Sequence, residues 1–133
     1  MRHLTPSYFL ALLSMTMGVF AQDSLPPKME GRWSNRSSGH SNSIEVEIQK
    51  MESATKAVVK IAFWPYCRTS ESVAEFRDGD WFFVAKRCTS PGASEILLKL
   101  RKVEGKNRLE GLYGSGDGPS VFSEGRTAYL EWK

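Results

Sequence analysis

The side chains that most often carry out acid–base or nucleophilic chemistry are sparse in this sequence. Beyond residue 3 the only histidine is His40, which lies in a stretch of serine, asparagine and glycine. A zinc site needs several such ligands together, a nucleophile needs a base beside it, and no Gly-x-Ser-x-Gly elbow occurs. We therefore expect a solvated loop histidine, no catalytic residue, no metal and no cofactor.

Two further patterns resemble chemical motifs but fit structural roles better. Glu71 and Glu75 could form a carboxylate pair, yet they fall on the polar face of a predicted strand. The glycine-rich run 114–118 looks like a phosphate-binding loop, but Pro119 and a strand follow it instead of the helix N-terminus that holds phosphate. We interpret them as a solvated strand face and a connecting loop.

The most informative cluster is Phe63-Trp64-Pro65-Tyr66-Cys67-Arg68. Aromatic side chains beside an arginine are typical of recognition surfaces, because they combine apolar area with polar tips. The alternative is that Phe63 and Trp64 complete the core while Tyr66 covers it. Both interpretations place the cluster at one end of the fold.

Composition indicates one globular domain. The chain has 133 residues, 41% of them hydrophobic, which is enough to bury a core. Its 18 basic and 15 acidic residues give a net charge of +3. The basic residues between 99 and 108 are interleaved with Glu104 and followed by Glu110, so they predict a solvated strand rather than a nucleic-acid surface. We expect no nucleic-acid partner.

The first 21 residues have the layout of a secretory signal peptide. Arg2 and His3 precede an apolar run, 9–20, and Val19 and Ala21 supply the small residues of a cleavage site. The run is too short to cross a bilayer of about 30 Å as a helix. We expect cleavage after Ala21, a single domain over 22–133, and a secreted or periplasmic protein without stable membrane insertion.

Export has a consequence for the two cysteines, Cys67 and Cys88. In an oxidising compartment an even number of cysteines usually pairs. We predict a disulfide between them, worth roughly 3 kcal/mol in the chain-entropy model.

Apolar and polar residues alternate along most of the remaining chain, which predicts an all-β domain. Asp78-Gly79-Asp80 and the run 104–107 mark tight turns between apolar runs. No stretch after residue 21 keeps a helical period over the length of a helix. The predicted strands are a short one around 31–33, then 43–51, 57–64, 72–77, 81–88, 95–103, 108–114 and 127–133.

The lengths of the seven predicted connections alternate, which favours an up-and-down barrel. The odd-numbered connections, 34–42, 65–71, 89–94 and 115–126, are longer than the turns between them. In a meander the odd-numbered connections share one end, so we expect a mouth of loops and a closed opposite end. Both cysteines then lie at the mouth. Strands of about seven residues are shorter than the 9–11 of a transmembrane barrel.

The segment Lys28-Met29-Glu30-Gly31-Arg32-Trp33 resembles the first motif of lipocalins, and Gly31-Arg32-Trp33-Ser34-Asn35 is similar to the opening of avidins. Both are calycins, which are eight-stranded antiparallel up-and-down barrels. The resemblance implies that Trp33 plugs the closed end and that Arg126, just before the last strand, lies over it. The segment departs from lipocalins at Ser34, and Gly39 stands where avidins have a biotin ligand, so we expect no biotin site.

Two functions remain open. A binding protein could hold a small, largely apolar ligand in the barrel or at its mouth, if small inward side chains leave room: Ala62, Ala74, Ala85 and Gly111. Alternatively, a protein-binding module such as a periplasmic inhibitor or immunity protein would act through the mouth loops and have a filled core and an exposed apolar patch. A calycin-like enzyme would need polar groups with perturbed pKa values in a cavity. For either binding function the predicted contact residues are Asn35, Trp64, Tyr66, Arg68 and Tyr113.

Overall fold

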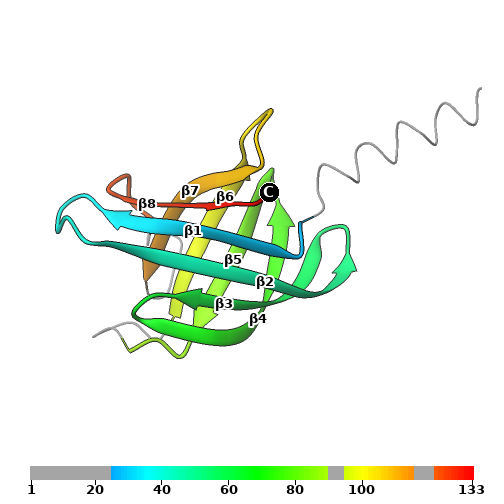
Figure 1. Ribbon diagram of the computed structural model, residues 1–133, viewed down its shortest axis with the longest axis horizontal. Helices are drawn as coiled ribbons and strands as arrows, with labels where there is room; N and C mark the ends of the chain where they lie inside the picture. Colours follow the sequence, from blue (N-terminus) through cyan, green and yellow to red (C-terminus); the bar gives the residue numbers. More distant parts are fainter. Residues whose placement is uncertain (1–24, 90–94, 116–121) are drawn as a thin grey trace, which may run out of the picture.

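A computed structural model describes residues 25–89, 95–115 and 122–133, and the predicted signal peptide lies outside these ranges. The strands close into one antiparallel barrel, in which each strand pairs with the next and the last pairs with the first (Figure 1). The predicted all-β, eight-stranded up-and-down barrel is therefore confirmed. The strands are β1 (Lys28–Asn35), β2 (Ser41–Ser53), β3 (Lys56–Phe63), β4 (Cys67–Arg77), β5 (Asp80–Lys86), β6 (Glu95–Lys102), β7 (Arg108–Ser115) and β8 (Arg126–Glu131).

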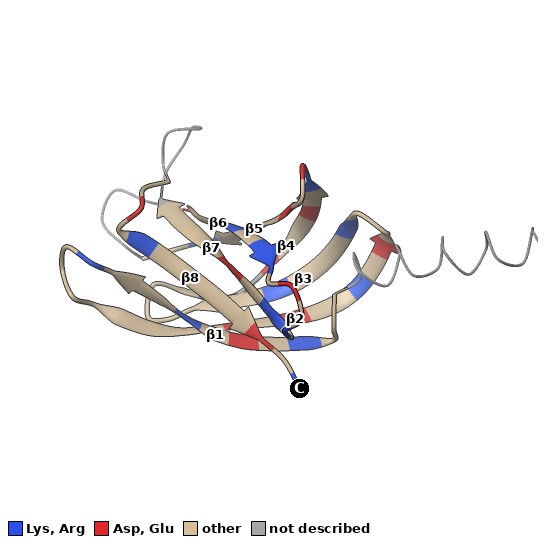
Figure 2. Ribbon diagram, turned by 90° about the horizontal axis from the view of Figure 1, so that it is seen from above, with Lys and Arg blue, Asp and Glu red and all other residues tan. Residues whose placement is uncertain are grey.

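The alternating pattern of the sequence decides which face of each strand points inward. On β2, Ile44 and Val46 are buried, whereas the residue that follows each of them, Glu45 and Glu47, is exposed. Successive side chains of a strand point to opposite faces, so the apolar set of every strand meets inside the barrel. The basic and acidic residues lie interspersed along the strands (Figure 2). Burial of the apolar faces is the main stabilising contribution.

The two ends of the barrel differ in their connections. At the mouth the connections are 36–40, 64–66, 87–94 and 116–125, and at the opposite end they are 54–55, 78–79 and 103–107. The two longest connections, 87–94 and 116–125, lie at the mouth, but the predicted grouping is only partly confirmed, because 36–40 at the mouth and 103–107 at the closed end have the same length. The connection after β3 was expected to run to Glu71, but it has only three residues because β4 already begins at Cys67 and pairs with β3 there.

The interior is filled at mid-height. Ala74 and Ala85 point inward with no exposed surface, so no space as large as a water molecule adjoins them. The large rings of Trp81 and Phe83 pack near them, with centroids 6.4 Å apart. Ala62 was expected to face inward, but it pairs with the exposed Glu45 and so lies on the outer face, because it is one residue out of phase with the inward-facing Ile61 and Phe63.

Gly111 does face inward, but it does not create room for a ligand. A Cβ there would overlap the main-chain carbonyl of Lys99 on β6. Gly31 on β1 is in the same situation against the carbonyl of Tyr129 on β8. Both glycines therefore permit close approach of neighbouring strands, which a strongly coiled barrel wall needs.

The shortest run of paired residues lies between β4 and β5. Their register covers three residue pairs next to the turn, from Arg77–Asp80 to Glu75–Phe82, whereas every other strand pair has at least five. Toward the mouth, other contacts join these two strands. We call the boundary between them the β4–β5 seam. The Ser72 hydroxyl donates a hydrogen bond of 2.5 Å to the carbonyl of Val84.

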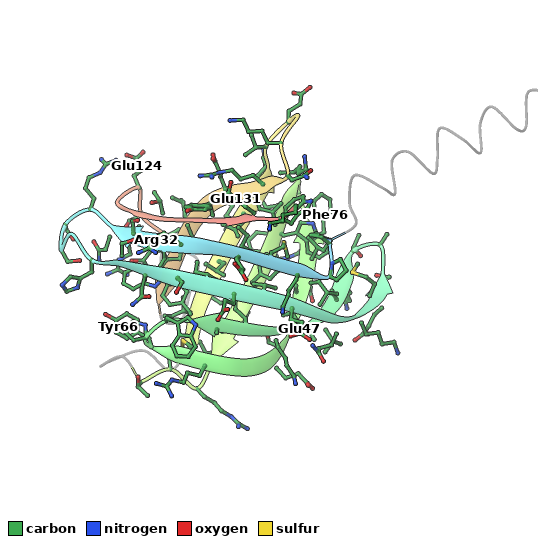
Figure 3. All side chains as sticks on the ribbon, viewed as in Figure 1. Arg32, Glu47, Tyr66, Phe76, Glu124 and Glu131 are labelled. Carbon is green, nitrogen blue, oxygen red and sulfur yellow. A yellow bond between two sulfur atoms is a disulfide. The ribbon has the colours of Figure 1, made fainter. Side chains whose placement is uncertain are left out.

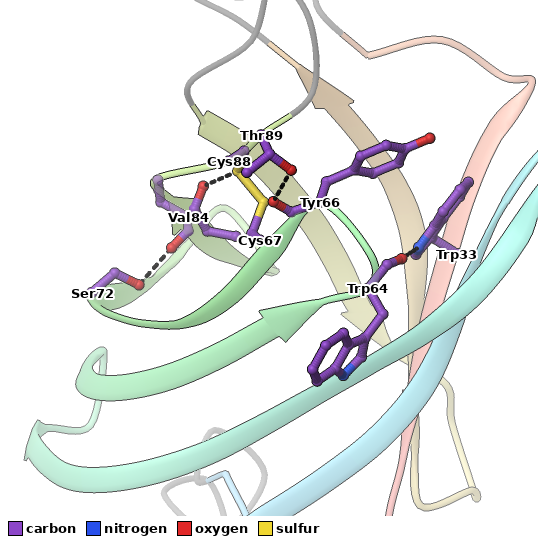
Figure 4. Close-up of a disulfide and its surroundings, with 9 residues drawn as sticks. Trp33, Trp64, Tyr66, Cys67, Ser72, Val84, Cys88 and Thr89 are labelled. Carbon is purple, nitrogen blue, oxygen red and sulfur yellow. Dashed lines mark hydrogen bonds between the residues drawn. A yellow bond between two sulfur atoms is a disulfide. The ribbon is translucent and has the colours of Figure 1, made fainter.

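The predicted disulfide closes the seam at the mouth. Cys67 and Cys88 are bonded, with their Cα atoms 4.3 Å apart (Figure 4). Next to the bond, the main-chain N–H of Thr89 donates to the carbonyl of Tyr66 at 2.9 Å. The expected pairing and its position at the mouth are both confirmed.

The Asp-Gly turn at the other end of this hairpin also forms as the sequence predicted. Asp78 and Gly79 have positive φ angles of 52° and 85°, conformations that Asp tolerates and Gly adopts freely. Arg101 from β6 donates to the nearly buried carboxylate of Asp80 at 3.1 Å and to the carbonyl of Asp78 at 3.0 Å. This bridge fixes the turn to the neighbouring strand.

Candidate binding site at the barrel mouth

Trp33 lies at the mouth and not at the closed end. It is the sixth residue of β1, which runs toward the connection 36–40. Its ring stacks on Phe63 with centroids 5.2 Å apart, and its Nε1–H donates to the carbonyl of Trp64 at 2.6 Å (Figure 4). The calycin resemblance placed Trp33 at the closed end, which is wrong for this chain because the motif falls near the end of its strand instead of the beginning.

Two tyrosines flank this tryptophan. The ring centroids of Tyr66 and Tyr113 lie 5.7 Å and 5.6 Å from that of Trp33. Tyr113 is 6% exposed, whereas Tyr66 is only partly buried and stands at the mouth (Figure 3). Together with Phe63 they form the aromatic cluster of the mouth, which fills the barrel at this end.

Arg126 reaches the same cluster from β8. It alternates with the buried Ala128 and Leu130, so its side chain starts on the inward face. Burial raises the pKa of the Tyr113 hydroxyl, the positive charge of Arg126 opposes that rise, and the hydroxyl of Tyr66 adds to it. Tyr113 therefore interacts electrostatically with both Arg126 and Tyr66.

Trp64 and Arg68 lie elsewhere, on the outer wall. The Trp64 indole N–H donates to the carboxylate of Glu45 at 2.9 Å, and the Arg68 guanidinium lies 5.0 Å from the centre of the Trp64 ring. A cation over an indole is a favourable arrangement. The predicted cluster 63–68 is therefore divided: Phe63 and Tyr66 point into the mouth, and Trp64 and Arg68 flank it outside.

Asn35 has a local structural role in the connection that follows β1. Its side-chain oxygen accepts hydrogen bonds from the main-chain N–H and the hydroxyl of Ser37, at 3.1 Å and 2.8 Å. It also borders an open hollow of about 300 Å³ that Arg36 and His40 line. The five predicted contact residues thus occupy three places around the mouth and do not form one pocket.

Four arginines, which we call the mouth arginines, lie in or next to the mouth connections, and we did not expect this group from the sequence. Arg36 and Arg87 are exposed in the connections after β1 and β5, and Arg68 is exposed at the start of β4. Arg126 lies next to the fourth connection. One carboxylate, Glu124, lies in the described parts of the mouth connections (Figure 3). Part of the signal was present: Arg36, Arg68 and Arg126 fall within odd-numbered connections predicted from the sequence, and Arg87 lies two residues before the connection 89–94.

The chemistry of these groups is that of recognition. Arginine binds carboxylates through two parallel hydrogen bonds, and it is enriched with tyrosine and tryptophan in binding hot spots. Within residues 25–89, 95–115 and 122–133, no three side chains of His, Cys, Asp or Glu are grouped so as to hold a metal ion. No helix among these residues is long and apolar enough to cross a membrane.

Comparisons with protein-family models, with curated proteins and with solved structures found no match to this chain.

Proposed function

We propose that this protein is an exported, non-enzymatic binding module that holds an acidic surface of a partner protein at its mouth. The observation that carries the proposal is that an arginine lies in or next to each of the four mouth connections, three of them exposed. The signal-peptide pattern and the disulfide support an extracytoplasmic location. A rigid barrel that presents variable connections at one end is a common scaffold for binding.

Burial inside the barrel favours a protein partner over a ligand enclosed in the barrel. Ala74 and Ala85 adjoin no water-sized space, and the aromatic cluster occupies the mouth end above them. Among the described residues, Val73 is the large hydrophobic residue that is exposed, at 46%, and it lies on the outer wall of the barrel, away from the mouth. The mouth therefore offers arginine and aromatic edges for polar recognition more than an apolar patch.

A small ligand at the mouth is the second candidate. The observation that favours it is the contact of Tyr66 and Tyr113 with the ring of Trp33, next to the inward face of β8 that carries Arg126. Such a ligand would combine a flat apolar body with an anionic group. Native mass spectrometry of the purified protein distinguishes the two candidates, because a bound small molecule adds a fixed mass that disappears on denaturation.

The test of the protein-binding proposal is affinity capture from the cell envelope or medium of the source organism. The bait is the wild-type protein or a variant with Arg36→Gln, Arg68→Gln and Arg87→Gln. A partner held through these arginines should bind the variant at least about 100-fold more weakly, and its capture should fall as salt rises from about 0.1 to 1 M because salt screens surface charges.

The matched control removes the same charge at the other end of the barrel. Lys28, Lys50 and Lys106 are exposed there, and their replacement by Gln also lowers the net charge by three. The control variant should capture the partner as wild type does. Equal capture by the arginine variant and by wild type would refute the proposed role of the mouth.

A further inference from the structure

The outer wall of the barrel carries a feature that the proposed function does not use. Outward positions of a barrel in water are usually polar, yet at one level of this wall four neighbouring strands carry aliphatic residues. Val58 pairs with Val73 between β3 and β4, and Val84 pairs with Leu97 between β5 and β6. The two pairs meet at the β4–β5 seam, where Val58, Val73 and Val84 line one open hollow of about 350 Å³.

Charged side chains border this apolar stripe on its mouth side. Lys60 pairs with Glu71 between β3 and β4, and Lys86 pairs with Glu95 between β5 and β6. Across the four strands the row therefore reads basic, acidic, basic, acidic. Glu71 and Lys86 both line the hollow at the seam, which shows that the row is continuous there as well.

We propose that this stripe is a self-association surface that binds a second copy of the chain. We place the two copies face to face, related by a two-fold axis that runs parallel to the strands through the seam. The strand order of the second copy is then reversed, and each row of residues faces the same row of the other copy. Beside the axis, Glu71 then faces Lys86 of the second copy. The apolar stripe meets the apolar stripe of the other copy, with Val73 opposite Val84.

The charges also select this orientation against its main competitor. Beside the seam, a two-fold axis perpendicular to the strands would place Glu71 opposite Glu75, which are like charges, and Lys86 opposite the uncharged Phe82. The charge complementarity therefore comes from the row on the mouth side.

The surface predicts a weak dimer. The wall of the closed barrel curves away on both sides of the seam, so the contact is smaller than the roughly 800 Å² per copy of a standard interface. Association should therefore depend on concentration. The mouth arginines lie outside the patch and stay available in the dimer.

Sedimentation equilibrium of the purified, oxidised protein from about 10 μM to about 1 mM tests the proposal. The wild-type mass should rise toward that of a dimer, and Val73→Lys should remain monomeric throughout. Because Val73 is exposed, the variant should keep the wild-type circular dichroism and melting temperature. Thr127→Lys, an exposed position on β8, adds the same charge elsewhere and should dimerise as wild type does.

A charge exchange then tests the orientation. In Lys86→Glu alone, the new glutamate of each copy faces Glu71 of the other copy. In Glu71→Lys alone, the new lysine of each copy faces Lys86 of the other copy. Each variant should therefore be monomeric. An equal mixture restores both opposite-charge pairs across the interface and should form a heterodimer. A wild-type protein that stays monomeric at about 1 mM, a Val73→Lys variant that dimerises as wild type does, or a mixture that stays monomeric would each overturn the proposal.

Discussion

Removal of the Cys67–Cys88 disulfide, in the double variant Cys67→Ala and Cys88→Ala, is expected to destabilise the barrel in one place. The cysteines are separated by 21 residues, and in the chain-entropy model a cross-link of that span restricts the unfolded chain by about 3 kcal/mol at 25 °C. A domain of this size is stable by about 5–15 kcal/mol in total. The loss should therefore lower the melting temperature by about 10 °C.

The structure also predicts where protection is lost. The β4–β5 register has three residue pairs, so the mouth half of the seam depends on the disulfide, on the hydrogen bond from Ser72 and on the contacts of Thr89. Hydrogen exchange should accelerate at Tyr66, Cys67 and Thr89 and change little in β2 and in the closed-end turns. Guanidinium unfolding followed by tryptophan fluorescence gives the free energy.

Reduced wild-type protein provides the control, since it lacks the cross-link but keeps both sulfur-bearing side chains. It should show the same pattern of exchange as the double variant. Two results would refute the reasoning: a loss of free energy below about 1 kcal/mol, since the model predicts three times as much, or an equal loss of protection all round the barrel.

Three further predictions concern packing, the closed end and pH. Gly31→Ala should prevent folding or cost several kcal/mol because its Cβ would overlap a main-chain carbonyl, whereas Gly105→Ala, at φ 76° in open space, should cost about 1 kcal/mol; chemical denaturation compares them. Asp80→Asn weakens the hydrogen bonds from Arg101 and should cost about 1 kcal/mol, with faster exchange confined to the nearby turn. Because burial raises the pKa of Tyr113, the folded state retains its proton longer than the unfolded chain. This contribution to stability is present below pH about 10 and is lost as pH rises further. Tyr113→Phe should reduce that loss in thermal melts between pH about 9 and 11.

The sequence alone predicted the architecture because strand alternation and turn chemistry are local. Ile44 and Val46 alternate with glutamates, and Asp78-Gly79 has the conformational freedom of a tight turn, so both elements formed as expected. The order of the connections then placed Cys67 and Cys88 at the same end, where they are bonded. The expected length of the connection after β3 was wrong, since its polar residues join β4 by pairing with β3, and residue types alone did not indicate that the two strands pair so close to the turn.

Only the tertiary structure decided which side chains meet at the mouth. A short motif around Trp33 does not say at which end of its strand the ring will lie, and the chain places it beside Phe63 and Tyr66. Trp64 and Tyr66 are two residues apart, yet one points outward to Glu45 and the other into the mouth. Barrel closure brings together residues from strands far apart in sequence, and its register is a property of the whole sheet rather than of any segment.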